Sequence, residues 1–154
     1  MTVSDRIVWF GRYEGWLRML AHGVRDGDAD CIDRAARLFD LMLPDECAIV
    51  PMPSHEGRAE QMMMVAERLH SLNPARPVRD CLACEEHPSC YMEKKEGYPP
   101  TPIRMYLRGG APRVPDEFPI YIIDNVVASG ATASAALRCL PHAKVCSLAL
   151  STWR

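Results

Sequence analysis

The stretch YIIDNVVASGATASAAL, residues 121–137, holds the residue types best suited to chemistry. An apolar run ends at Asp124 and Asn125, and small residues follow before an alanine-rich helical pattern. A helix N-terminus offers unpaired backbone N–H groups and a partial positive charge, both suited to phosphate. Small side chains let a phosphate approach the backbone, and Gly130 can take a tight turn that a β-carbon would hinder. We therefore expect a phosphate site over residues 128–132, beside the carboxylate of Asp124.

Two familiar phosphate-binding motifs do not describe this segment. It lacks the Gly-Lys-Ser/Thr sequence of a P-loop and the glycine pattern of a dinucleotide fingerprint. The structural alternative is an ordinary turn between a strand and a helix, capped by Ser129 or Thr132.

The elements that position this junction are predicted from hydrophobic patterns. Short apolar runs at residues 47–53, 118–124 and 143–150 predict buried strands, with a further short strand at 76–82. Helical spacing follows the first and second of these runs, with Met62, Val65, Ala66 and Leu69 on one helix and residues 133–140 as the other. Alternating strands and helices imply crossover connections, so we expect an α/β fold with a mainly parallel central sheet flanked by helices.

The remaining segments complete a predicted single domain over residues 1–154. Helical spacing predicts two N-terminal helices within residues 1–44, one over residues 4–21 and one from Asp28 or Asp30 to Met42. The core then covers residues 45–154 and includes a long irregular loop at residues 83–117, rich in proline. A loop of this length in a compact domain is usually functional or mobile.

Composition excludes several classes of protein. The formal net charge of -2 gives no basic field for general nucleic-acid binding. No apolar stretch reaches the ~18 residues of a membrane helix, and the N-terminus lacks the pattern of a signal peptide. We expect a soluble cytoplasmic protein without membrane association, in which the 7 cysteines are reduced thiols.

Two motifs together resemble the type I phosphoribosyltransferases. IYIIDNVVASGATASAAL, residues 120–137, is similar to their phosphoribosyl diphosphate (PRPP) motif: an apolar strand, two acids, two aliphatic residues, then Thr/Ser-Gly-x-Thr. AIVPMPSHEGRAEQMMMVAERL, residues 48–69, resembles the first core strand, diphosphate loop and helix of the amidophosphoribosyltransferase-like branch related to competence protein ComF. The residues that carry this second likeness are Val50, Pro51, Pro53, Gly57, Arg58 and Gln61.

The resemblance implies a phosphoribosyltransferase that transfers the phosphoribosyl group of PRPP to a nucleobase or related amine and releases diphosphate. It places Asp124 and Asn125 at the ribose as catalytic residues, with Mg²⁺ bound together with PRPP and Asp124 as its protein ligand. The 5'-phosphate would lie on Ala128, Ser129, Gly130, Ala131 and Thr132. The diphosphate would lie on Ser54, His55, Gly57 and Arg58, since a guanidinium suits phosphate geometry. For Arg58 the alternative is a solvated side chain in the first helical turn.

The resemblance also implies a lid, an acceptor class and an assembly. The loop at residues 83–117 would form the family's lid or hood, which closes over PRPP and excludes water. Ala128 replaces the acid typical of enzymes that act on hypoxanthine or guanine, which favours the adenine or orotate kinds. A homodimer is expected because dimers are frequent in similar proteins. The lid residues that would contact PRPP are Tyr91, Lys94, Lys95, Arg104 and Arg108.

Two further functions stay open. Asn125 stands where the family has a second acid, and an amide cannot supply the negative charge that holds Mg²⁺ or stabilises a developing cation. This favours a non-catalytic regulator or competence-like accessory protein that senses PRPP or a nucleotide. The third hypothesis is a metal-binding module, because CLACEEHPSC provides a Cys₃His set chemically suited to zinc, at Cys81, Cys84, His87 and Cys90.

Overall fold

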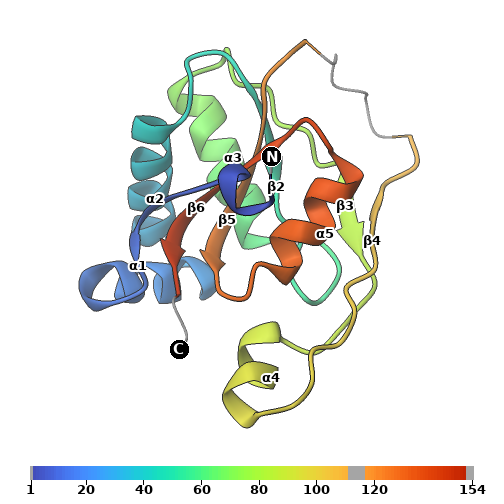
Figure 1. The fold of residues 1–154 in the computed structure, drawn as a ribbon. Helices are drawn as coiled ribbons and strands as arrows, with labels where there is room; N and C mark the ends of the chain where they lie inside the picture. Colours follow the sequence, from blue (N-terminus) through green and yellow to red (C-terminus); the bar gives the residue numbers. More distant parts are fainter. Residues whose placement is uncertain (1, 111–116, 152–154) are drawn as a thin grey trace.

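Four parallel strands form the centre of the computed structural model, which describes residues 2–110 and 117–151. The strand order is β1 (Ile7–Arg12), β6 (Lys144–Leu150), β5 (Ile120–Val127) and β2 (Ala48–Pro51). Five α-helices flank this sheet within the described residues. The predicted α/β fold with a mainly parallel central sheet is therefore confirmed (Figure 1).

The helices cover the two faces of the sheet unequally. Helices α1 (Gly15–Arg25), α2 (Ala29–Met42) and α3 (Gln61–Leu72) pack on one face, around fully buried residues such as Phe39 and Leu69. Helix α5 (Ala131–Cys139) packs on the other face together with a small sheet of β3 (Leu82–Cys84) and β4 (Met105–Leu107). Helices thus pack on both faces of the sheet, as parallel sheets require, but the edge strand β1 leaves Val8, Trp9 and Phe10 exposed.

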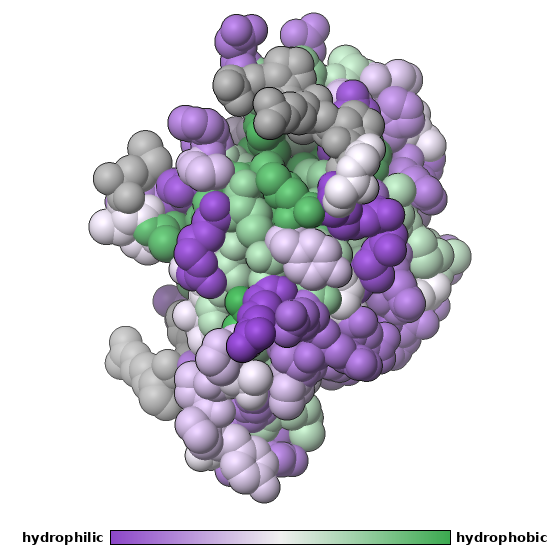
Figure 2. All heavy atoms as spheres, turned by 90° about the vertical axis from the view of Figure 1, so that its right-hand side faces the viewer, coloured by the Kyte–Doolittle hydropathy of each residue, from purple (hydrophilic) through white to green (hydrophobic). Residues whose placement is uncertain are grey.

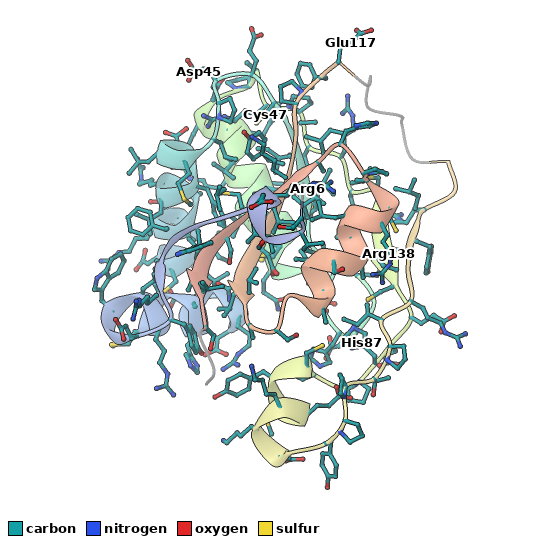
Figure 3. The ribbon with its side chains drawn as sticks, viewed as in Figure 1. Arg6, Asp45, Cys47, His87, Glu117 and Arg138 are labelled. Atoms are coloured by element: carbon teal, nitrogen blue, oxygen red, sulfur yellow. The ribbon has the colours of Figure 1, made fainter. Side chains whose placement is uncertain are left out.

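The predicted helix over residues 4–21 is wrong in its first half. Residues 4–6 form one 3₁₀ turn, and residues 7–12 form β1, which pairs parallel with β6 so that Ile7 lies opposite Val145. Arg6, labelled in Figure 3, fixes the start of this strand because its Nε donates to the carbonyl oxygen of Ala143 at 3.1 Å. The Ile-Val-Trp-Phe run has high strand propensity, and the open edge of β6 supplies its backbone partners. The apolar spacing at Leu17 and Leu20 belongs to α1 alone.

The segment predicted as one irregular loop, residues 83–117, contains regular structure. Strands β3 and β4 pair antiparallel, and the chain forms helix α4 (Cys90–Glu96) in the segment that connects them. Ser89 caps α4 by accepting a hydrogen bond from the Met92 N–H, and Thr101 donates from its N–H to the Glu93 carboxylate at 3.1 Å. Strands of three residues and a helix of two turns are too short to show a period. Residues 111–116 of the predicted loop lie outside the described residues.

The predicted strand at residues 76–82 is also largely wrong. Val78 makes one isolated parallel bridge to Ile49, and Leu82 already belongs to the antiparallel β3. Arg76 is fully buried there, with Nε donating to the carbonyl oxygen of Pro44 at 2.8 Å. This segment therefore connects the two sheets and adds no full strand to the central one.

The face formed by α5 and the small sheet is mixed in character. Apolar side chains gather near its centre, with hydrophilic side chains around them (Figure 2). Tyr106 and Leu107 of β4 are each 51% exposed. Across the described ranges, no helix has both the length and the apolar character needed to cross a membrane.

Candidate functional site

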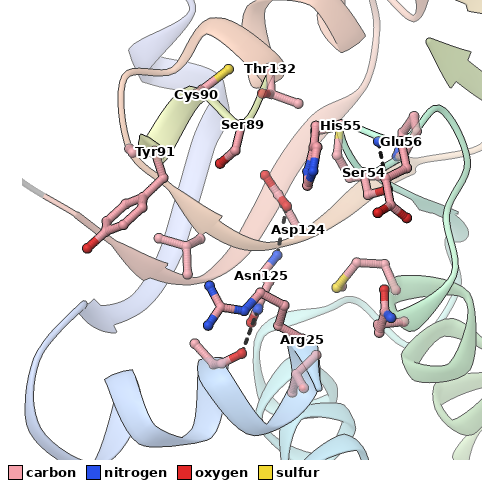
Figure 4. Close-up of a pocket in the computed structure, with 18 of the residues that line it drawn as sticks. Arg25, Ser54, His55, Glu56, Ser89, Cys90, Tyr91, Asp124, Asn125 and Thr132 are labelled. Atoms are coloured by element: carbon pink, nitrogen blue, oxygen red, sulfur yellow. Dashed lines mark hydrogen bonds between the residues drawn. The ribbon is translucent and has the colours of Figure 1, made fainter. Parts of the chain in front are cut away.

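A cavity of about 480 Å³ lies at the carboxyl ends of β5 and β2. Its walls come from four segments: the end of β1 with α1, the loop after β2 with the start of α3, the loop leading into α4, and the β5–α5 junction (Figure 4). Ligands of open parallel sheets bind at this edge, where loops lead into helix N-termini. The residues predicted to contact PRPP that line the cavity are Ser54, His55, Tyr91, Asp124, Asn125, Ala128 and Thr132.

The β5–α5 junction adopts the turn that its glycine predicts. Gly130 has φ 81°, in the left-handed region, and directly precedes the first residue of α5. Ser129 Oγ accepts a hydrogen bond from the Ala131 N–H at 3.3 Å. Ala128 and Thr132 border the cavity, whereas the three residues between them form the turn outside its lining. The helix N-terminus therefore begins at the cavity, as a phosphate site requires.

Asp124 is the carboxylate at the end of the central strand. The N–H of Asn125 donates to its Oδ1 at 2.8 Å, which lowers its pKa, but burial dominates and raises the pKa to about 7. A carboxyl group that titrates near neutral pH can act as an acid or a base, and such shifts are concentrated at functional sites. The group lies in the middle of the cavity in Figure 4.

Asn125 lines the same cavity but is held by α1. Its Nδ2 donates to the carbonyl oxygen of Ala21 at 2.8 Å. Its Oδ1 is buried and has no hydrogen-bond partner among the described residues. The amide nitrogen must face the carbonyl, since two oxygens would repel each other, so Oδ1 is the atom left to accept a hydrogen bond from a ligand. Asn125 therefore offers an acceptor oxygen without a negative charge.

The loop after β2 brings only part of the predicted diphosphate site to the cavity. Ser54 and His55 line it, whereas Gly57 and Arg58 do not. The Arg58 guanidinium lies 3.5 Å from the carboxylate of Asp80, which also binds Arg108 at 2.7 Å. In this conformation Arg58 makes an ion pair outside the cavity.

The same loop already uses several of its N–H groups. The Ser54 N–H donates to the Arg58 carbonyl at 3.1 Å, and the Gly57 N–H donates to the Ser54 carbonyl at 3.0 Å. The Glu56 N–H donates to Ser54 Oγ at 3.2 Å. A diphosphate bound here would have to displace or rearrange these bonds, because each N–H has one proton to donate.

Gly57 is held in a position that other residues cannot occupy. Its φ is 109°, its carbonyl accepts from the Cys84 N–H at 3.0 Å, and an added β-carbon would lie 2.9 Å from the Cys84 carbonyl oxygen. We expect Gly57→Ala to lower the free energy of unfolding by about 3 kcal/mol, through backbone strain and displacement of the loop. Chemical denaturation measures this loss.

Gly97→Ala is the matched control for this substitution. Gly97 has φ 75° and open space around the site of a β-carbon, so its substitution introduces strain alone, about 1 kcal/mol. Equal losses in the two variants would contradict the proposed role of the contact with Cys84.

Several cavity residues were not predicted from the sequence. Ser89, which caps α4, is one of these. His87, Cys90 and Tyr91 also line the cavity, although the sequence predicted the first two as zinc ligands and Tyr91 as a lid residue. The N-terminal region adds three more: Tyr13, His22 and Arg25. Tyr13 lies in the bend after β1, and His22 and Arg25 belong to the end of α1, beyond the helix predicted over residues 4–21.

The other predicted lid residues lie elsewhere. Arg104 is 3.9 Å from the Glu85 carboxylate, and Arg108 binds Asp80. Lys94 and Lys95 belong to the last turn of α4 and do not line the cavity.

The structure does not bring the four predicted zinc ligands together as a metal-binding group. All four are described, and no group of three or more His, Cys, Asp or Glu side chains in the described ranges could hold a metal ion. Cys81 and Cys84 are buried, and burial raises the pKa of both thiols, which disfavours the thiolate that binds zinc. Cys84 instead donates from Sγ to the Ser54 carbonyl at 3.3 Å.

The oxygen atoms at the end of β5 fit Mg²⁺ only as part of a complex with phosphates. Asp124 offers one carboxylate to the cavity. Mg²⁺ commonly binds through one or two carboxylates together with substrate phosphates and water. The donor set is therefore adequate for a metal ion that arrives with a diphosphate.

Fold and site together define an α/β protein with a ligand cavity at the carboxyl edge of a parallel sheet. No protein-family model matches the chain, and no curated protein is significantly similar to it. A proposal about function therefore depends on the cavity residues and on the two sequence motifs that border the cavity.

Proposed function

We propose that the protein binds PRPP in this cavity and transfers its phosphoribosyl group to a nitrogen acceptor. The observation that carries the proposal is the position of both PRPP-like motifs on one cavity: Asp124 and the 128–132 turn after β5, and Ser54 and His55 after β2. We propose as well that the fold is that of the type I phosphoribosyltransferases. The parallel sheet and its flanking helices support this.

Each end of the cavity takes a different part of PRPP in this proposal. The N-terminus of α5 holds the 5'-phosphate with backbone N–H groups and Thr132, and Asp124 accepts hydrogen bonds from the ribose hydroxyls. Residues 54–58 hold the diphosphate. The acceptor nitrogen forms a bond to C1 of the ribose, and the bond from C1 to the diphosphate oxygen breaks with its electron pair. When bound with PRPP, Mg²⁺ would neutralise charge on the diphosphate.

Arg58 can reach the diphosphate only after it leaves Asp80. Its side chain is 56% exposed and the ion pair is long, at 3.5 Å, so the pair contributes at most about 1 kcal/mol. Asp80 keeps Arg108 as its partner, at 2.7 Å, when Arg58 moves. A diphosphate can therefore compete for Arg58 without leaving Asp80 unpaired.

The second candidate function is a sensor that binds PRPP or a nucleotide without transfer. The bond from Asn125 to Ala21 favours it, because this residue adds no charge to the site and is fixed in place. The occupied N–H groups of the 54–58 loop favour it as well, since the loop is not arranged around a diphosphate.

One titration and one assay separate the two functions. We expect PRPP with Mg²⁺ to bind saturably by calorimetry, and a panel of bases and amines to release diphosphate in at least one case. Saturable binding with no release from any acceptor would leave the sensor. Absence of PRPP binding would overturn both the transferase and a PRPP sensor.

Thr132→Val removes the hydroxyl at the phosphate end of the cavity. It should weaken PRPP binding about tenfold in the same titration.

A further inference from the structure

Arg25 is a cation of the cavity wall that the PRPP motifs do not explain. It is the one Lys or Arg side chain among the described residues that line the cavity, whereas three carboxylates line it: Glu56, Glu60 and Asp124. Arg25 forms no ion pair with any of these, or with any other carboxylate in the described ranges. Its charge is thus available to a ligand, and a guanidinium favours planar oxyanions.

Two neighbours hold the Arg25 guanidinium in place. Its Nη2 donates to Nδ1 of His22 at 2.8 Å, and Nε2 of His22 lies 2.9 Å from the hydroxyl of Tyr13. Because arginine only donates, Nδ1 must be the acceptor, and in the neutral imidazole Nε2 carries the proton and donates to Tyr13. The two rings also stack, with centroids 6.1 Å apart. One of five guanidinium N–H groups is used in this way, which leaves the others for a ligand.

Arg25 and the phosphate end of the cavity lie on different sides of the sheet edge. Successive side chains of a strand point to opposite faces, so Asp124 and Asn125 diverge, and Asn125 is bonded to α1. In Figure 4 Arg25 lies beside Asn125 on the α1 side, with Thr132 and Cys90 beyond Asp124. A ligand with its 5'-phosphate at α5 and its ribose at Asp124 would direct the group attached to C1 of the ribose toward α1.

We infer that Arg25, positioned by His22 and Tyr13, binds the carboxylate of an acceptor, so that the acceptor class is a ring or amine bearing a carboxylate. This inference rests on the proposed function. The unpartnered Oδ1 of Asn125 lies on the same side and suits an N–H or O–H donor. The acceptor would therefore carry a carboxylate at the edge that faces Arg25 and an N–H or O–H donor at the edge that faces Asn125.

Matched mononucleotides test this without requiring turnover. Orotidine and uridine 5'-monophosphates differ only by a carboxylate, and nicotinate and nicotinamide mononucleotides form a second pair. We expect the carboxylate member of at least one pair to bind about tenfold more tightly to the native protein, by calorimetry. In Arg25→Gln the ratio of the two affinities within that pair should fall to about one. The affinity for PRPP should change less than twofold.

Variants around Arg25 separate binding from positioning. His22→Leu removes the hydrogen-bond acceptor of Arg25 and should reduce the affinity ratio. His22→Asn keeps a hydrogen-bond acceptor near the position of Nδ1 and should restore most of the ratio. Tyr13→Phe should reduce the ratio partly. Arg34→Gln is the matched control, because Arg34 is exposed on α2 and does not line the cavity, and it should leave every affinity unchanged.

The outcomes distinguish this inference from the proposed function. PRPP binding without a preference in either pair, including pairs that do not bind, overturns the inference and leaves the function. Equal weakening of PRPP and of all mononucleotides in Arg25→Gln also overturns it, since Arg25 would then bind a phosphate. If PRPP itself does not bind, the proposed function fails and the inference fails with it.

Discussion

Asp124→Asn should abolish phosphoribosyl transfer and at the same time stabilise the protein. We expect diphosphate release to fall by ~10²- to 10⁴-fold, because the amide cannot accept a proton or carry the charge that the proposed function assigns to Asp124 at the ribose. The stability gain has a separate cause. Burial raises the pKa of Asp124 to about 7, so the ionised form is unfavourable in the folded protein by about 4 kcal/mol.

The sign and the pH range of this gain follow from the shifted pKa. Between about pH 4 and pH 7 the folded state holds a proton that the unfolded state releases, so stability falls as pH rises. The variant has no such dependence, and it retains an oxygen to accept the Asn125 N–H. We expect the free energy of unfolding of Asp124→Asn to exceed that of the native protein by up to ~4 kcal/mol at pH 8. This difference should shrink as the pH falls toward 4.

Denaturation curves at pH 4.5 and pH 8 and an assay of diphosphate release measure the two effects. In the native protein the rate should decline as pH falls below about 7, as the carboxylate becomes protonated. Asp45→Asn is the control, since Asp45 is exposed in the turn after α2 and should change neither quantity. A variant that loses stability at pH 8, or that retains full activity, would contradict this account of Asp124.

Asn125→Asp should destabilise the protein and fail to raise turnover. From the sequence alone, restoring the second acid is a test of whether its absence limits the chemistry. The structure predicts the opposite result. The new carboxylate would lose the hydrogen bond from Nδ2 to the Ala21 carbonyl, made at 2.8 Å, and would place an anionic oxygen against that carbonyl. We expect a loss of about 3 kcal/mol at pH 8.

Asn73→Asp provides a matched comparison on the surface. Asn73 makes the same type of bond, from Nδ2 to the Asp45 carbonyl at 2.9 Å, in an exposed setting. Its substitution should cost about 1 kcal/mol or less, because water can solvate both oxygens. Thermal denaturation of both variants, with diphosphate release measured for Asn125→Asp, checks the prediction. Increased turnover in Asn125→Asp would show that the hydrogen bond to the Ala21 carbonyl does not restrict this position.

Local patterns predicted the elements that carry the two motifs. The apolar runs that became β2, β5 and β6 and the helical spacing of α2 and α3 need only neighbouring residues to be recognised. Gly130 at a junction of small residues predicted a tight turn, and its φ of 81° agrees with this. The parallel sheet follows from the alternation of such elements along the chain.

Contacts between distant residues decided the rest. Residues 7–12 became a strand because β6, about 140 residues later, offers a free edge, and no local period reports such a partner. Arg58 faces Asp80 instead of the cavity, and Asn125 is bonded to Ala21, through contacts 22 and 104 residues apart in sequence. Sequence thus predicted the strand, the turn and the helix N-terminus that form the proposed phosphate site, because each of these needs only neighbouring residues. Tertiary structure determined which charges face it, since side-chain partners depend on how separate elements pack.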